Sequence, residues 1–186
     1  MGAFGYLSVL LSIILGLAIA QILQGYRAIL LARGRVRLSA PVLIWSGLLL
    51  LFAAQAWWAS FDLREREQWD FLSFAVILLQ MALLYMLAAV VLPDVGPSEK
   101  VDLIEHSDQH RRTFFGFLIA MLLASLAKDV ILDHRLPRPV NLGFHLLLVA
   151  ISIIGIFWKP PRVQLILALA ALASFLSYIG VLFARL

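Results

Sequence analysis

Three ionisable side chains stand out because they lie beside or inside apolar stretches. Lys128 and Asp129 follow residues 113–127, an apolar stretch too short to cross about 30 Å of hydrocarbon as an upright helix. Both are therefore predicted to lie in the last turns of a spanning helix, and His145 begins the next apolar stretch at a similar depth. Ionisable groups within a membrane commonly serve ion paths and proton relays. This cluster is a candidate ion vestibule; the alternative is a snorkelling helix end beside one hydrogen-bonded histidine.

A second group combines a carboxylate with two imidazoles. Asp102, His106 and His110 are four residues apart, so on a helix they share one face. This set would suit a divalent cation or a pH sensor. The alternative is an ordinary solvated face. Two histidines four residues apart are a weak metal signal when no third ligand is fixed beside them. No other cofactor is expected.

Uncharged amides interrupt three of the apolar stretches. Gln55 and Gln80 stand alone in theirs, and Gln21 and Gln24 lie near the end of the first. An amide in a dry core needs a hydrogen-bonding partner. The four side chains are predicted either to join helices pairwise or to mark one polar route through a bundle.

The first apolar stretch also carries small residues at intervals of four, namely Ser8, Ser12, Gly16 and Ala20. Such a stripe lets two helices approach closely. It is a candidate for helix packing or for the lining of a conduit. The last stretch has a similar face (Ala170, Ser174, Ser177, Gly180 and Ala184), and two such faces predict a homo-oligomer.

The composition identifies the kind of molecule that holds these residues. Apolar residues make up 63% of the 186 positions and charged residues 14%, against about 25% charged in soluble domains. The mean hydropathy is +0.97. There is no cysteine, which excludes disulfides, thiolate catalysis and Cys-type metal sites. The net charge of +4 fits loops at a lipid surface, and no nucleic-acid module is present.

Six apolar stretches are long enough to span a bilayer as helices. They are residues 4–26, 41–61, 69–92, 113–132, 140–158 and 162–184, and the seven prolines fall at their joints. The fold class predicted is an all-α polytopic membrane protein with one six-helix domain. The polar segment 94–112 is expected to include a short helix lying on the membrane.

The distribution of basic residues and one recurring pattern add two expectations. With the N-terminus outside, nine basic residues of the connections and the tail lie inside and six outside, which favours both termini outside.

The pattern Arg37-Leu38-x-x-Pro41-Val42 recurs later in the chain as Arg135-Leu136-x-x-Pro139-Val140. The match allows a 3+3 inverted repeat, as in many transporters. The alternative is two proline-initiated helices that follow basic loops.

Some segments resemble known membrane proteins. SIILGLAIAQIL, RVRLSAPVLIW, AQAWW and WDF, all in the first ninety residues, resemble uncharacterised bacterial six-helix membrane proteins. This resemblance implies a bacterial inner membrane and no particular activity. In that membrane, the outside position favoured above for both termini is the periplasm. In size and helix number the chain is similar to small tetrameric potassium channels of the lysosomal type, but it lacks their FSD-type motif, so that likeness is architectural.

These features predict a homo-oligomeric conduit, either an ion channel or a small-solute transporter. The alternative is a non-catalytic sensor, scaffold or assembly subunit in the membrane. An enzyme is not expected, because GxSxG, HExxH, P-loop and GxGxxG motifs are all missing from the sequence.

Overall fold

The computed structural model describes residues 3–66, 69–96, 100–135 and 137–183. The described residues form α1 (Ala3–Leu31), β1 (Val36–Arg37), α2 (Ala40–Ala59), a 3-10 helix η1 (Ser60–Glu65), α3 (Phe71–Val91), β2 (Val101–Asp102), α4 (Leu103–Asp133), α5 (Pro139–Phe157) and α6 (Pro161–Phe183). Six of these helices are long and apolar enough to cross a membrane. The predicted all-α polytopic fold is confirmed, and the chain is an integral membrane protein.

Local chemistry explains where the helices begin. Prolines occupy the first turn of α2, α5 and α6, where a missing amide N–H removes no helical hydrogen bond. Two aspartates cap the starts of α3 and α4. The Asp70 carboxylate accepts a hydrogen bond from the Ser73 amide at 2.6 Å, and Asp102 accepts one from the Ile104 amide at 2.8 Å.

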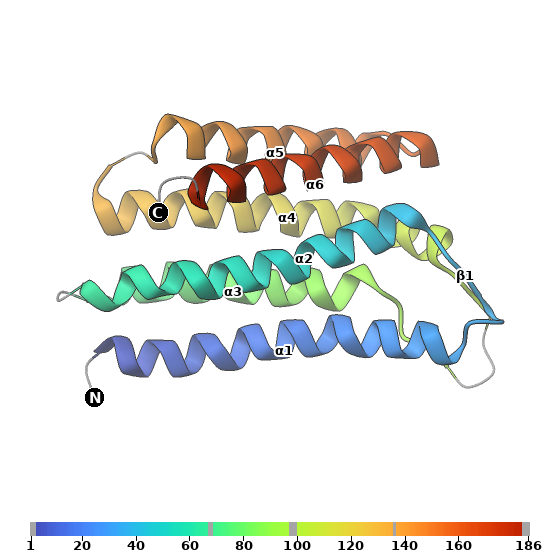
Figure 1. Ribbon diagram of the computed structural model, residues 1–186, viewed down its shortest axis with the longest axis horizontal. Helices are drawn as coiled ribbons and strands as arrows, with labels where there is room; N and C mark the ends of the chain where they lie inside the picture. The colour runs from blue at the N-terminus through green and yellow to red at the C-terminus, as the bar shows by residue number, and fades with distance from the viewer. Residues whose placement is uncertain (1–2, 67–68, 97–99, 136, 184–186) are drawn as a thin grey trace.

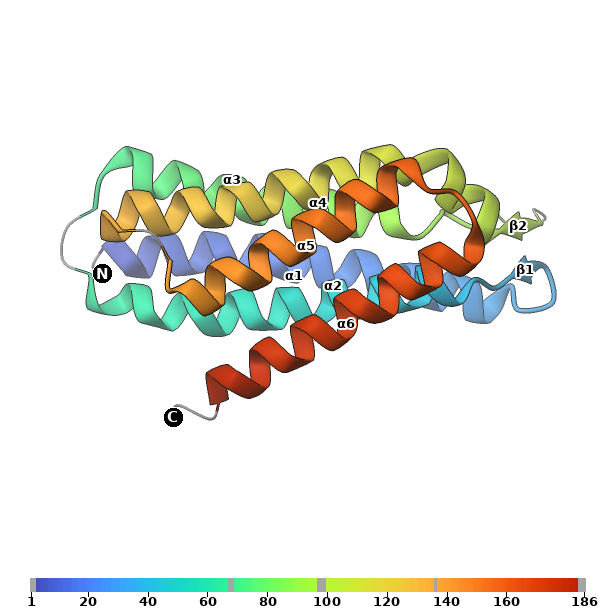
Figure 2. The same cartoon turned by 90° about the horizontal axis from the view of Figure 1, so that it is seen from above.

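The six helices run alternately up and down along one long axis (Figure 1). Helix α3 packs between α1 and α4, and α2 contacts α1, α3 and α6. Helices α5 and α6 form a hairpin that slants across the bundle, with α5 on α4 and α6 on α2 (Figure 2). All six helices therefore contribute side chains to one shared interior.

The fourth helix differs from the expectation. It begins at Leu103 rather than near 113, so the second half of segment 94–112 forms its first turns. The described residues of that segment contain no separate surface helix. At 31 residues it is about 46 Å long, more than the hydrocarbon thickness. A parallel pairing of β1 with β2 precedes it, with Val36 opposite Val101 and Arg37 opposite Asp102. This pairing holds the cap residue where the helix starts.

The two halves of the chain pack differently. Helix α1 lies directly against α3, whereas α5 crosses between α4 and α6 (Figure 2). Both α2 and α5 carry a proline in the first turn, which fits the alternative of two proline-initiated helices. The inverted repeat stays a prediction.

Candidate functional site

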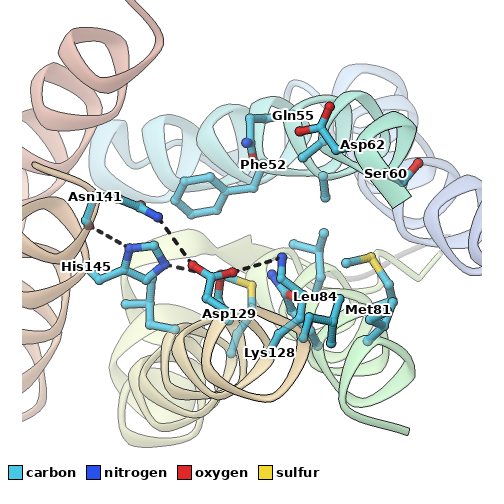
Figure 3. Close-up of a pocket in the computed structure, with 18 of the residues that line it drawn as sticks. Phe52, Gln55, Ser60, Asp62, Met81, Leu84, Lys128, Asp129, Asn141 and His145 are labelled. Carbon is cyan, nitrogen blue, oxygen red and sulfur yellow. Dashed lines mark hydrogen bonds and ion pairs between the residues drawn. The ribbon is translucent and has the colours of Figure 1, made fainter. Parts of the chain in front are cut away.

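A cavity of about 330 Å³ lies in the end of the bundle where α2 ends and α3 begins. All six helices line it, α1 through Leu11 alone among the lining residues. Gln55, Gln80, Lys128, Asp129 and His145 are among its walls, so two separate sequence candidates, the lone amides and the ionisable cluster, meet in one place. Figure 3 shows Lys128 and Asp129 projecting from α4 toward the helix that carries Phe52 and Gln55.

The charged pair in this cavity is loosely joined. Lys128 Nζ lies 3.9 Å from Asp129 Oδ1, and their side chains are 23% and 24% exposed. The other carboxylate oxygen of Asp129 accepts a long hydrogen bond, 3.4 Å, from Asn141 Nδ2 on α5. Consecutive residues of a helix do not face each other, which accounts for the long ion-pair distance. Both charges therefore keep bonding capacity for a third group.

His145 is held in one orientation by two partners. Its Nδ1 lies 2.9 Å from the Asn141 carbonyl, and its Nε2 lies 3.2 Å from Ser125 Oγ. A carbonyl only accepts, so Nδ1 carries the proton and donates it. In the neutral ring Nε2 is then an acceptor, and the Ser125 hydroxyl donates to it. The ring joins α5 to α4 beside Asp129 (Figure 3).

Three polar atoms of the cavity wall are buried without a hydrogen-bonding partner in the described part of the chain. They are Gln80 Oε1, Asn141 Oδ1 and Ser174 Oγ, from α3, α5 and α6. Buried polar atoms in folded proteins are nearly always bonded. These three are grouped around one cavity, so they are available to a guest molecule there.

One side of the cavity is closed and the other carries charge. Leu48, Leu87 and Leu118 are completely buried, each about one turn beyond the lining residues of its helix. At the opposite rim Arg66 Nη2 contacts Asp133 Oδ1 at 2.8 Å, and the Asp133 side chain is 60% exposed. The cavity is therefore reached from the end where both described termini lie.

The small and polar residues of α1 lie elsewhere. Ser8 Oγ donates to the Gly5 carbonyl at 3.0 Å, while Ser12, Gly16 and Gln24 are exposed and Gln21 is half-buried. None of these five is part of the cavity wall. On α6, Ala170, Ser177 and Gly180 are also exposed, and Ala184 lies outside the described residues. Most residues of both small faces thus point away from the bundle, although Ser174 is buried. The homo-oligomer stays a prediction.

The candidate metal ligands are placed at the opposite end and are already bonded. Asp102 contacts the Ile104 amide and Arg37 Nη1, at 2.8 and 3.1 Å. His106 Nε2 lies 2.9 Å from the Val90 carbonyl, and His110 Nδ1 lies 3.0 Å from the His106 carbonyl. Over the residues that the structure describes, no three His, Cys, Asp or Glu side chains are grouped to hold a metal ion.

Sequence reasoning did not place several polar residues in the cavity wall, among them Ser125, Asn141, Ser174 and Tyr178. One signal was present, because Asn141 and His145 are four apart and share a helical face. Ser125 likewise precedes Asp129 by four residues. Ser174 was noticed only as a small residue, and its burial depends on how α6 packs on α2.

Comparison with protein-family models, with curated proteins and with solved structures found no match to this chain. The residues of the site themselves are therefore the basis for its chemistry. What they offer is the Lys128–Asp129 pair, further charges of Asp62, Arg66 and Asp133, and several hydrogen-bonding groups. They line a partly enclosed space within the membrane-spanning part of the chain.

Proposed function

We propose that the protein is a small-solute transporter whose solute binds in the cavity between α2, α3, α4, α5 and α6. The observation that carries this proposal is the one-sided cavity, with a charged pair and three unpartnered polar atoms in its walls. Polar groups inside a membrane protein usually face a substrate or ion pathway. Their grouping from several helices supports a binding site rather than a set of separate helix contacts.

Between the two kinds of conduit, the geometry favours a transporter over a channel. A channel needs a continuous path, whereas Leu48, Leu87 and Leu118 fill the bundle beyond the cavity with completely buried apolar side chains. A site reached from one side fits alternating access, in which helices rock around a bound solute. The slanted α5–α6 hairpin packs on α4 and α2, and we expect this hairpin to move relative to the other four helices.

The walls indicate the chemical class of solute. Lys128 and Asp129 offer opposite charges, which suit the carboxylate and ammonium groups of a small zwitterion. Aromatic pairs form an apolar side, with Phe52 and Phe175 centroids 4.5 Å apart and Phe144 and Tyr178 centroids 5.2 Å apart. A volume of about 330 Å³ lies at the small end of ligand sites. We infer a zwitterion with a modest apolar part.

The role we propose is non-catalytic. Ser125 and His145 do lie at the distance of a nucleophile and its base. The third group in such a site is normally a carboxylate that orients the ring. Here the ring Nδ1 is bonded to a carbonyl of its own helix, and Asp129 is engaged by Lys128 and Asn141.

The test is uptake by proteoliposomes that contain the purified protein. A panel of radiolabelled zwitterions is compared with fluxes of potassium, sodium, protons and chloride. We expect saturable zwitterion uptake that Gln80→Leu lowers about tenfold, the effect of one lost hydrogen bond to bound solute. Gln24→Leu is the matched control, because Gln24 is an exposed amide outside the cavity. It should leave uptake unchanged, and both variants should unfold at the wild-type temperature.

Two results would contradict the proposal. Ion flux without zwitterion uptake would make the protein a channel. Saturable zwitterion binding without uptake would make it a membrane sensor or assembly subunit that uses the same cavity.

A further inference from the structure

A second, much smaller cavity lies at the other end of the bundle. Its volume is about 30 Å³, and it is enclosed by the start of α2, the end of α3, the first turns of α4 and the start of α6. The leucine layer of Leu48, Leu87 and Leu118 stands between it and the solute cavity, because Trp45, Val90 and Phe114 line the small cavity on the far side of that layer. The two cavities are therefore separate sites.

A buried arginine without a counter-ion faces this cavity. Arg111 on α4 is 5% exposed, and its Nε and Nη1 have no hydrogen-bonding partner in the described part of the chain. No carboxylate of the described residues forms an ion pair with it, unlike Arg37 and Arg66. A guanidinium stays charged at any physiological pH, so the charge cannot be removed by deprotonation. A buried charge is stable only when it is compensated.

A third donor in the same wall is also unpartnered. Trp45 on α2 is 4% exposed, and its indole Nε1 has no acceptor among the described residues. Its ring is fixed by edge contacts with Phe114 and Phe115, with centroids 5.5 and 5.6 Å away. The indole therefore cannot easily turn toward another acceptor. Three buried donor nitrogens, two of them in the guanidinium of Arg111, thus belong to residues that line one cavity.

Four other polar residues line the cavity, His106, Ser107, His110 and Gln164. In the described part of the chain none of them accepts a hydrogen bond from Arg111 Nε or Nη1, or from Trp45 Nε1. His106 and His110 engage the Val90 and His106 carbonyls through ring nitrogens. Gln164 donates its amide hydrogens to the Gly155 and Trp158 carbonyls. In addition, α2 and α6 both begin at this cavity, and the positive ends of helix dipoles favour an anion.

We infer that this cavity binds one small inorganic anion, with chloride as the physiological candidate, held by Arg111 and Trp45. The small volume of about 30 Å³ has room for a small ion beside the guanidinium. The anion neutralises Arg111 and fastens α4 to the start of α2. This site does not depend on the proposed transport function.

The experiment is thermal unfolding of the purified protein in a zwitterionic detergent, with sodium chloride replaced by sodium gluconate at constant ionic strength. We expect chloride, and equally bromide, to raise the unfolding temperature along a saturable curve, while gluconate does not. Arg111→Gln should abolish this response. Arg112→Gln is the matched control, since Arg112 is its exposed neighbour on the same helix, and it should keep the full response.

A milder variant covers the case in which Arg111→Gln fails to fold. Trp45→Phe keeps the ring but removes one N–H, and it should raise the chloride concentration for half-maximal response about tenfold. An equal response to gluconate, or an unchanged chloride response in Arg111→Gln, would overturn the inference. So would stabilisation by phosphatidylglycerol but not by chloride, which would assign Arg111 to a lipid phosphate.

Discussion

The charged residues at the two ends of α4 illustrate how the same side chain types take different roles. Asp102 at the start is engaged by a helix amide and an arginine, so it serves the fold. Asp129 near the end has only a long ion pair and a long hydrogen bond. Loosely satisfied groups in a cavity are those that a ligand can still engage. This difference is the basis for placing the solute at Asp129.

Asp102 leads to a prediction about acid stability. The Ile104 amide N–H, and then the Arg37 guanidinium, hold the pKa of Asp102 below its usual value. A pKa lowered by folding gives stability that is present above the unfolded pKa of about 3.9 and is lost as the pH falls through the folded pKa. We therefore expect Asp102→Asn to unfold at a lower temperature than wild type at pH 7. The difference should shrink below about pH 4.

The measurement is the unfolding temperature in detergent between pH 7 and pH 3. Asp108→Asn is the control, because this exposed aspartate lies in the same helix beyond the cap. It should follow wild type at every pH. A difference between Asp102→Asn and wild type that persists unchanged at pH 3 would mean that the carboxylate charge is not what matters.

Part of the site could be predicted at the residue scale. Gln55, Gln80, Lys128, Asp129 and His145 were singled out because polar groups are costly in lipid, and all five line one cavity. In the sequence Arg111 is one basic residue of the polar segment 94–112, and nothing there marks it as buried. Its burial arises from contacts of α4 with α2 and α3, which lie far away in the sequence, so no local pattern could show it.

At the scale of helices, the spans were predicted well and one polar segment was not. Apolar length defined all six helices, since lipid leaves no other way to satisfy the backbone. Segment 94–112 is polar, so its sequence does not distinguish a surface helix from an extension of α4. The deciding contacts are the pairing of Val36–Arg37 with Val101–Asp102, more than sixty residues apart in the chain.

Helix packing leads to a prediction at Gly155 on α5. A Cβ added there would collide with the ring of Phe115 on α4, which also fixes the indole of Trp45. We expect Gly155→Ala to destabilise the protein by about 1–3 kcal/mol, because a packed ring must shift. Gly143 is the matched control on the same helix, since a Cβ there meets nothing within 4 Å.

The comparison is between the two alanine variants in one thermal or denaturant series. Gly143→Ala should be neutral or slightly stabilising, because alanine has the higher helix propensity. Equal effects of the two variants would show that α5 does not approach Phe115 as described. A chloride response weakened in Gly155→Ala alone would further connect this contact to the site at Trp45.

At the scale of the whole molecule, the bundle has two ends of different character. One end holds the solute cavity, and the other holds the buried arginine and the β1–β2 pair, with a layer of leucines between them. The basic residues of the connections are more numerous at the second end, so the positive-inside rule favours a cytoplasmic position for that end. The cavity would then open to the outside, on the same side as both termini.

This orientation can be tested with single cysteines, since the chain has none of its own. Asp62→Cys places a thiol at the exposed rim of the cavity, and Arg33→Cys places one in the exposed turn after α1. In intact bacterial cells expressing each variant, we expect a membrane-impermeant maleimide to label Asp62→Cys at once. Arg33→Cys should be labelled only after the cells are permeabilised, and the cysteine-free protein should not be labelled at all. The opposite pattern would place the cavity mouth and both termini in the cytoplasm. The solute would then be taken from the cytoplasmic side, and chloride would reach Arg111 from outside.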